Sequence, residues 1–209
     1  MNIEDLNIRY LNEIINLQTS IYTYLDNKAQ LETLSREEFE VVLSEGYAVG
    51  IIKEGELVAF RAFLTPDDKD PHHLALDVDL APENSIYSEV SLVHPNHRGQ
   101  GMQTIMGEYL LKKVEESGRY KYILATVAPD NLPSLIDKFR LGFVIAQTKY
   151  KYQHKLRHIL LKELNHAPNS EDDEITYVPY HDIDWMLNNG SNFIGIGMRK
   201  NDIMYIRKQ

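Results

Sequence analysis

The stretch Val93-His-Pro-Asn-His-Arg-Gly-Gln-Gly-Met-Gln103 decides the fold of this chain. An apolar run over residues 86–93 leads into it and ends at a proline. Gly99 and Gly101 then flank a glutamine beside Arg98, and an amphipathic helical pattern begins at once. This order predicts a strand, a glycine-rich turn and a helix N-terminus. The first helical turn has unpaired N–H groups at its positive end, and glycine admits a ligand close to the backbone, so the segment favours phosphate binding.

Two common phosphate-binding loops do not fit this segment. A P-loop requires Lys-Ser or Lys-Thr after its last glycine, and neither pair follows Gly101. The dinucleotide-binding pattern requires a third glycine at position 104, which is Thr104. An ordinary strand-turn-helix connection remains the alternative interpretation of the segment by itself.

The pattern Arg98-x-x-Gly101, preceded by Val-x-Pro, resembles the pyrophosphate loop of the GNAT acyltransferase superfamily, [RQ]-x-x-G-x-[GA]. Gln103 occupies the last position, where that superfamily usually has glycine or alanine. Glutamine at this position is usual in a poorly characterised bacterial group of the superfamily, which this chain resembles most.

A second stretch, TVAPDNLPSLIDKFRLGF at 126–143, resembles the second signature of the superfamily, N-x-x-A/S-x-x-x-Y-x-x-x-G-F. Asn131, Ser134, Gly142 and Phe143 lie at the matching offsets. The two signatures follow each other in the right order and at the right separation, and the resemblance covers about residues 3–164. It implies an α/β fold with a mixed, mostly antiparallel sheet that is flanked by helices and splayed at its centre.

Composition limits the function classes. A chain of 209 residues, 43% of them hydrophobic, can bury the core of one domain plus a small appendage. No apolar run approaches the roughly 18 residues of a membrane span, and the N-terminus is not a signal peptide. The absence of cysteine excludes disulfides and thiolate metal sites, and we expect a cytoplasmic protein. A net charge of −9 argues against nucleic acid and mildly favours a cationic acceptor such as an amine.

Periodicity predicts the elements around the loop. We expect a helix over Asp5–Leu25, with Ile8, Leu11, Ile15 and Tyr22 on one face. Further predictions are a second helix opened by a capping box at Ser35 and Glu38, hairpins over 47–64 and 143–164, and a long polar loop over 65–84. Residues 165–174 are interpreted as a linker, and 193–207 as a last hairpin. We therefore divide the chain into a GNAT domain, 1–164, and a small C-terminal extension, 165–209, packed on or beside it.

The resemblance implies that acetyl-CoA binds as co-substrate. Its pyrophosphate would be held by six residues of the loop, namely Arg98, Gly99, Gln100, Gly101, Met102 and Gln103. The main-chain groups of Leu92 and Val93 would bind pantetheine and polarise the thioester carbonyl. Asn131 and Ser134 would hydrogen-bond pantetheine as well, although Asn131 is equally suited to cap the helix that follows it.

The catalytic acid and base are less constrained by the sequence. Glu89 lies four residues before Val93, so strand periodicity places both on one face, and Glu89 is our candidate general base. The alternative is an ordinary half-buried carboxylate, and Asp77 and Asp79 are weaker rivals. Lys138 stands where many GNAT enzymes have the tyrosine that protonates the leaving thiolate. The proton for the thiolate could come from Lys138 itself or from water, and Tyr150 and Tyr152 are alternative donors.

We expect no metal, because His94 and His97 have no third ligand at metal spacing. The function implied by the resemblance is N-acetyl transfer from acetyl-CoA to the primary amine of a small molecule or peptide. One alternative is a non-catalytic acyl-CoA-binding or sensor protein with a GNAT fold, which the missing tyrosine favours slightly. Another is an acyltransferase that uses a longer or aminoacyl donor. We expect neither nucleic acid nor membrane as partner, and the C-terminal extension could mediate a homodimer.

Overall fold

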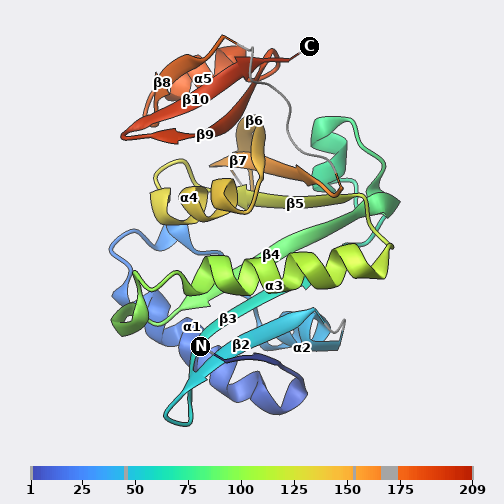
Figure 1. Cartoon of the computed structure of the whole chain (residues 1–209), viewed down its shortest axis with the longest axis vertical. Helices are drawn as coiled ribbons and strands as arrows, with labels where there is room; N and C mark the ends of the chain where they lie inside the picture. Colours follow the sequence, from blue (N-terminus) through green and yellow to red (C-terminus); the bar gives the residue numbers. More distant parts are fainter. Residues whose placement is uncertain (1, 45–46, 153, 166–173, 209) are drawn as a thin grey trace. The chain divides into compact units, whose positions relative to one another are not determined.

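The computed structural model describes residues 2–44, 47–152, 154–165 and 174–208 (Figure 1). The chain divides into two compact units. The first combines Met1–Pro66 with Ile86–Arg119, and the second combines Asp67–Ser85 with Tyr120–Gln209. The predicted linker falls almost wholly outside the described residues.

The first unit is a layered α/β structure. Its sheet has the order β1 (Ile3–Asp5), β2 (Ala48–Lys53), β3 (Glu56–Leu64) and β4 (Ser85–Val93). Each of these neighbours pairs in the antiparallel sense. The helices are α1 (Leu11–Tyr24), α2 (Arg36–Ser44) and α3 (Met102–Ser117), with short 3₁₀ turns at Ile8–Tyr10, Lys28–Gln30 and Pro95–His97.

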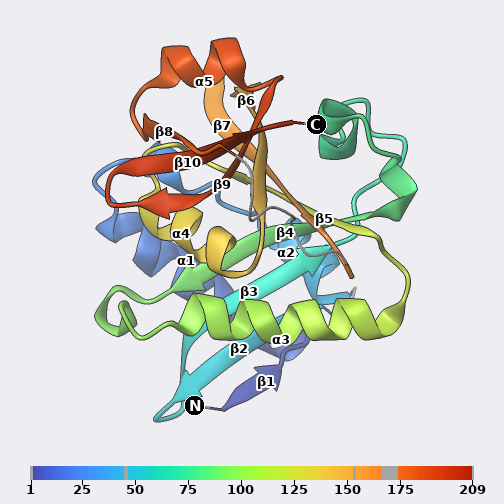
Figure 2. The same cartoon turned by 45° about the horizontal axis from the view of Figure 1, so that its top comes forward.

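Helices cover both faces of this sheet. Phe60 packs in one hydrophobic core with apolar residues of α1 and α2, including Ile14 and Phe39. Its neighbour Arg61 reaches α3 instead, where it hydrogen-bonds the carbonyl of Gln103. Because successive strand residues point to opposite faces, α3 lies across the sheet from α1 and α2. Figure 2 shows α3 crossing in front of β2 and β3.

Local sequence signals specify several of these elements. The capping box forms as predicted: Ser35 N–H donates to the Glu38 carboxylate at 2.6 Å, and Glu38 N–H donates to Ser35 Oγ at 3.2 Å. The β2–β3 hairpin is also confirmed. Its turn residues Glu54 and Gly55 have φ of 53° and 84°, the left-handed conformations of a tight two-residue turn.

The prediction of a single helix over Asp5–Leu25 was wrong at its start. Asp5 ends β1, and α1 begins only at Leu11. The buried face of α1 consists of Leu11, Ile14, Leu17, Gln18 and Ile21, whereas Ile8 and Tyr22 are exposed. The N-terminal residues pair with the edge of β2, and this non-local pairing overrides the helical periodicity read from the sequence.

The second unit is also built on antiparallel strands. Its strand order is β5 (Tyr122–Val127), β7 (Lys155–Glu163), β6 (Val144–Lys151), β9 (Phe193–Arg199), β10 (Asp202–Arg207) and β8 (Thr176–Pro179). Its helices are α4 (Leu132–Arg140) and α5 (Ile183–Asn189). The predicted β6–β7 and β9–β10 hairpins are confirmed, and β9 pairs with β6 at Gly195 and Ile145. The fold class, an α/β protein with a mostly antiparallel sheet flanked by helices, is confirmed.

The segment predicted as a long polar loop is more structured than expected. It contains 3₁₀ turns at Leu74–Val78 and Pro82–Asn84, and His73, Leu74 and Ala75 are buried. Asp77 anchors it to β6 through ion pairs of 2.6 Å to Lys149 and to Lys151. Polar composition concealed these contacts because the partners lie more than 70 positions away.

Candidate functional site

The glycine loop connects β4 to α3 as the sequence predicts. Gly99 and Gly101 both have left-handed φ, 76° and 71°, which is the conformation that favours glycine. Gly101 is the N-cap of α3, and no side chain caps this helix end. A Cβ added at either glycine would meet no heavy atom within 4 Å. The loop therefore presents open backbone at the positive end of a four-turn helix, which is the geometry of an anion site.

Side chains of neighbouring strands hold this loop to the sheet. Arg61 Nη1 donates to Gln103 O at 2.7 Å, and Gln103 Nε2 donates to Ser91 Oγ at 3.2 Å. Lys53 Nζ donates to Gln100 Oε1 at 2.8 Å. Gln103, the last position of the loop pattern and the second residue of α3, is thus also a tether to β4, a role that the usual glycine or alanine could not perform.

Arg98 is the loop's free cation. It is exposed, and within the described part of the chain no carboxylate pairs with its guanidinium. A guanidinium beside unpaired N–H groups can form charge-assisted hydrogen bonds to phosphate oxygens.

A β-bulge interrupts β4 at Glu89. Val90 pairs with Ala62 and Ser88 pairs with Phe63, so Glu89 is the extra residue. Ser88 and Ser91, three positions apart, both hydrogen-bond partners on the α3 side, which regular alternation would forbid.

The bulge overturns the face expected for Glu89. On its C-terminal side, Val90 and Leu92 belong to the core with α1 and α2, so Ser91 and Val93 face α3. Ser88 faces α3, so Glu89, which follows it directly at the bulge, is directed to the opposite face, that of α1 and α2. The expectation that Glu89 and Val93 share one face was therefore wrong, because it assumed an unbroken period of two.

The electrostatics of Glu89 suit a proton acceptor. Burial raises the pKa of its carboxyl above the ordinary value, and the negative charge of Glu38 raises it further. A carboxylate with a raised pKa is a stronger base than a solvated one, provided that it is still ionised at the working pH.

The hydrogen bonds between β3 and β4 also distinguish the main-chain groups of Leu92 from those of Val93. His94 N–H donates to Val58 O at 2.9 Å, so the hydrogen-bonded pairs with β3 recur at every second residue and include Leu92 with Phe60. The N–H and C=O of Val93 then point away from β3. Of the two residues expected to bind pantetheine through the main chain, Val93 is the one whose groups the β3 ladder leaves unused.

The second signature forms the start of α4 in the second unit. Asn131 is the N-cap, and its Oδ1 accepts from Ser134 N–H at 3.3 Å. This contact is the capping arrangement that the sequence left open beside a ligand role. Lys138 is buried in the same helix, with Nζ 5.4 Å from the centroid of the Phe143 ring.

Comparison with known proteins identifies the family. The model of the "Acetyltransferase (GNAT) family" matches residues 11–143, more than half of the chain. The chain belongs to the GNAT acetyltransferase family. It is accordingly an acyltransferase of the acetyl-CoA-dependent type. The comparison with curated proteins gives no match at the level of sequence.

Solved structures of GNAT proteins share the fold. YncA from Salmonella typhimurium, a putative acetyltransferase solved with its cofactor acetyl-CoA, is 14% identical with a TM-score of 0.61 over 82% of this chain and 98% of its own. An N-acetyltransferase from Staphylococcus aureus Mu50 is 17% identical with a TM-score of 0.58, over 78% and 98%. The ribosomal-protein-S18-alanine N-acetyltransferase of Escherichia coli is 16% identical with a TM-score of 0.55, over 82% and 97%.

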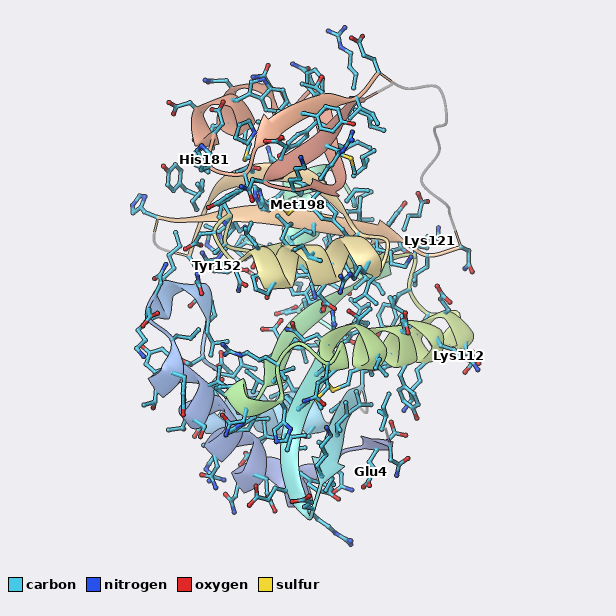
Figure 3. All side chains as sticks on the ribbon, turned by 60° about the vertical axis from the view of Figure 1, so that its left-hand side comes forward. Glu4, Lys112, Lys121, Tyr152, His181 and Met198 are labelled. Atoms are coloured by element: carbon cyan, nitrogen blue, oxygen red, sulfur yellow. The ribbon has the colours of Figure 1, made fainter. Side chains whose placement is uncertain are left out.

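The local environments of the rival acid and base candidates do not favour proton transfer. Both carboxylate oxygens of Asp77 are occupied by lysine ammonium groups, and Asp79 ends a 3₁₀ turn in a left-handed conformation. Tyr150 and Tyr152 are 56% and 44% exposed (Tyr152 is labelled in Figure 3), so neither is a desolvated proton donor.

Two further observations concern metals and membranes. Among the described residues, no group of three or more His, Cys, Asp or Glu side chains is placed to hold a metal ion. His94 instead caps the turn before the loop, with Nδ1 accepting from Asn96 N–H at 3.3 Å. In the part of the chain that the structure describes, no helix has the length and apolarity needed to cross a membrane.

Proposed function

We propose that this protein transfers the acetyl group of acetyl-CoA to the primary amine of a small molecule or peptide. The observation that carries the proposal is that β4 contains a bulged, desolvated carboxylate, Glu89, and leads directly into the open glycine loop. The loop supplies an anion site for the donor, and Glu89 supplies a base for the acceptor.

The donor's diphosphate would lie at the N-terminus of α3. Backbone N–H groups from Gly99 to Gln103 would bind its oxygens, and Arg98 would add a charge-assisted contact. Val93 would hydrogen-bond pantetheine through its main chain, as an added strand does at a sheet edge. We propose a hydrogen bond to pantetheine for Asn131 and Ser134 of the second signature as well.

Glu89 would prepare the amine for attack. An alkylammonium has a pKa near ~10.4 and must lose a proton before its nitrogen can act as a nucleophile. Glu89 takes this proton, directly or through one water, and the nitrogen attacks the thioester carbonyl. A main-chain N–H at Val93 stabilises the oxyanion that forms. The C–S bond then breaks, and the attacking nitrogen loses its second proton to water to give the amide. The thiolate of CoA, with a thiol pKa near ~8.5, takes a proton from water or from Lys138.

The acceptor class follows from charge. The base and its neighbour Glu38 are both carboxylates, and the chain carries a net charge of −9. Negative potential attracts an amine in its cationic form and raises its local concentration. Two of the fold neighbours named above are called N-acetyltransferases, which agrees with a nitrogen acceptor.

The C-terminal residues would serve the same domain. In the second unit β9 extends the sheet at β6, and Lys208 Nζ donates to Ala146 O at 3.1 Å and Gly190 O at 3.3 Å. We propose that residues 165–209 are an extension of the transferase domain.

Two measurements test the proposal. Calorimetry with acetyl-CoA tests donor binding, and a panel of polyamines, amino acids and peptides, followed by free-thiol release, tests transfer. Gly101→Ala should weaken acetyl-CoA binding at least tenfold, because a methyl group would enter the open space before the loop. Gly118→Ala is the matched control: Gly118 has φ 61°, equally open surroundings, and caps the other end of α3.

The outcomes separate the alternatives. Binding without thiol release from any amine would favour an acyl-CoA sensor. Tighter binding of a long-chain acyl-CoA than of acetyl-CoA would favour a different donor. Equal loss of affinity in the Gly101 and Gly118 variants would place the donor elsewhere.

A further inference from the structure

Arg61 is an unusual residue for the middle of a sheet. It lies in β3 within the apolar run Leu57–Leu64, and its side chain is completely buried. Arginine is almost never fully buried unless its guanidinium has partners. Here Nη1 donates to Gln103 O at 2.7 Å, Nη2 donates to Ser88 Oγ at 3.3 Å, and the guanidinium carbon lies 5.9 Å from the Phe63 ring centroid.

The shortest of these contacts reaches the first turn of α3. Gln103 is held through its carbonyl by Arg61 and through its side-chain amide by Ser91 of β4. The same residue is the position at which the chain departs from the family's loop pattern. The small residue usual there would leave the side-chain tether unmade.

Arg61 also joins the two halves of the proposed site. One nitrogen holds the loop, and another holds Ser88, the residue immediately before the bulged Glu89. A planar guanidinium presents its N–H groups in a fixed fork, so it sets the distance between the two groups that it binds. Main-chain donors are effective only when held within about 0.5 Å of the productive geometry.

We propose that Arg61 and Gln103 form a buried lock that positions the α3 first turn for the diphosphate of the donor. Arg61 is a positioning residue that acts through Gln103 and does not contact the ligand, whereas Gln103 combines a positioning side chain with the main-chain N–H proposed above to bind the diphosphate. The lock holds the loop in its binding conformation before the donor arrives, which reduces the ordering cost of binding. This inference rests on the donor site proposed above.

The test compares two donors, one with and one without the 3′-phosphoadenosine diphosphate of CoA. Acetyl-CoA contains it, and S-acetylpantetheine carries the same thioester without it. The readout is the ratio of kcat/KM for acetyl-CoA to kcat/KM for S-acetylpantetheine with one amine acceptor. Loss of a charge-assisted hydrogen bond corresponds to a factor of about ten or more. Arg61→Met should lower the ratio by about that factor, and Gln103→Ala, which restores a small residue, should lower it several-fold.

The double variant tests whether Arg61 and Gln103 act as one unit, because the effects of two such substitutions do not add. If Arg61 acts through Gln103, the double variant should lose little more than Arg61→Met alone. Gln18→Met is the matched control, since Gln18 is also buried and donates to and accepts from the backbone of Leu34 at 2.9 Å, away from the loop. Its ratio should stay within about twofold of wild type even if its stability falls.

Each result decides the proposal. An unchanged ratio in Arg61→Met, with both donors losing rate equally, would show a merely structural arginine. Should Arg61→Met fail to fold, Gln103→Ala decides alone, and an unchanged ratio there overturns the lock. A wild-type protein that binds no acetyl-CoA would instead overturn the proposed donor site itself.

Discussion

His158 should make the stability of this protein strongly dependent on pH. It lies in β7 with no exposed surface, and its Nδ1 is 2.8 Å from Thr148 Oγ1. Its other ring nitrogen, Nε2, has no hydrogen-bond partner among the described residues. Burial lowers the pKa of its imidazole from 6.5 to about 4. A proton on this ring would be a buried charge, so the folded state binds it far less readily than the unfolded chain does.

The sign and the size of this pH dependence follow from the linkage between proton binding and folding. Between pH 4 and 6.5 the unfolded chain binds a proton that the folded protein excludes, so the free energy of unfolding falls as pH decreases through this window. The contribution of His158 is complete above pH 6.5 and lost at about pH 4. A difference of two to three pKa units corresponds to about 3 kcal/mol, since one unit is worth about 1.4 kcal/mol.

The assay is denaturant unfolding of wild type and His158→Gln between pH 4.5 and 8. Glutamine can still hydrogen-bond Thr148 but does not titrate, so its stability should lack this pH dependence. The difference in unfolding free energy between the two proteins should be constant above pH 7 and change by about 2–3 kcal/mol towards pH 4.5. His72→Gln serves as the control, because His72 is exposed.

A difference in unfolding free energy between wild type and His158→Gln that does not change with pH would refute the reasoning. So would an NMR titration of wild type in which His158 protonates near pH 6.5 without unfolding. The titration needs no variant, so it decides the matter even if His158→Gln is too unstable to purify.

Three further predictions concern the proposed base and its surroundings. Glu89→Gln should lower kcat/KM by a factor of about 10²–10⁴ and remove the acid limb of its pH profile; an intact limb would exclude Glu89 as base. Glu38→Gln should move that limb to lower pH by removing a repulsive charge, whereas Glu37→Gln, one position away, should not; equal shifts would contradict the assigned neighbour. Ser35→Ala should cost about 1 kcal/mol in chemical denaturation by breaking the capping box, and no loss would show that the α2 cap is dispensable.

Short-range chemistry made part of this fold predictable. The capping box at Ser35, the turn at Glu54-Gly55 and the glycine loop all depend on residues within a few positions of one another. Their conformations follow from cap geometry and from the freedom of glycine at positive φ, which are properties of the residue types themselves. The family resemblance then supplied the order of the elements.

The features that could not be predicted from the sequence depend on contacts between residues far apart in the chain. The lock joins Arg61 to Gln103 across 42 positions, and the only local signal was a single arginine inside an apolar strand. Pairing of Ile3–Asp5 with β2 shortened the first helix, although helical periodicity continued through it. The bulge at Glu89 depends on the register with β3, and no residue type in β4 announces it.

The bulge matters most because it determines which side of the sheet each substrate would approach. An unbroken strand would direct Glu89 towards α3, the side that already holds the loop. With the extra residue, Glu89 follows Ser88 onto the face opposite α3, the face of α1 and α2, while the loop anchors Ser91 and Gln103 stay on the side of α3. The connection between α1 and α2 is itself fixed by the paired hydrogen bonds of Gln18 with Leu34. In the proposed mechanism, Glu89 therefore meets the acceptor amine from the face of β4 that carries α1 and α2, not from the face that holds the loop.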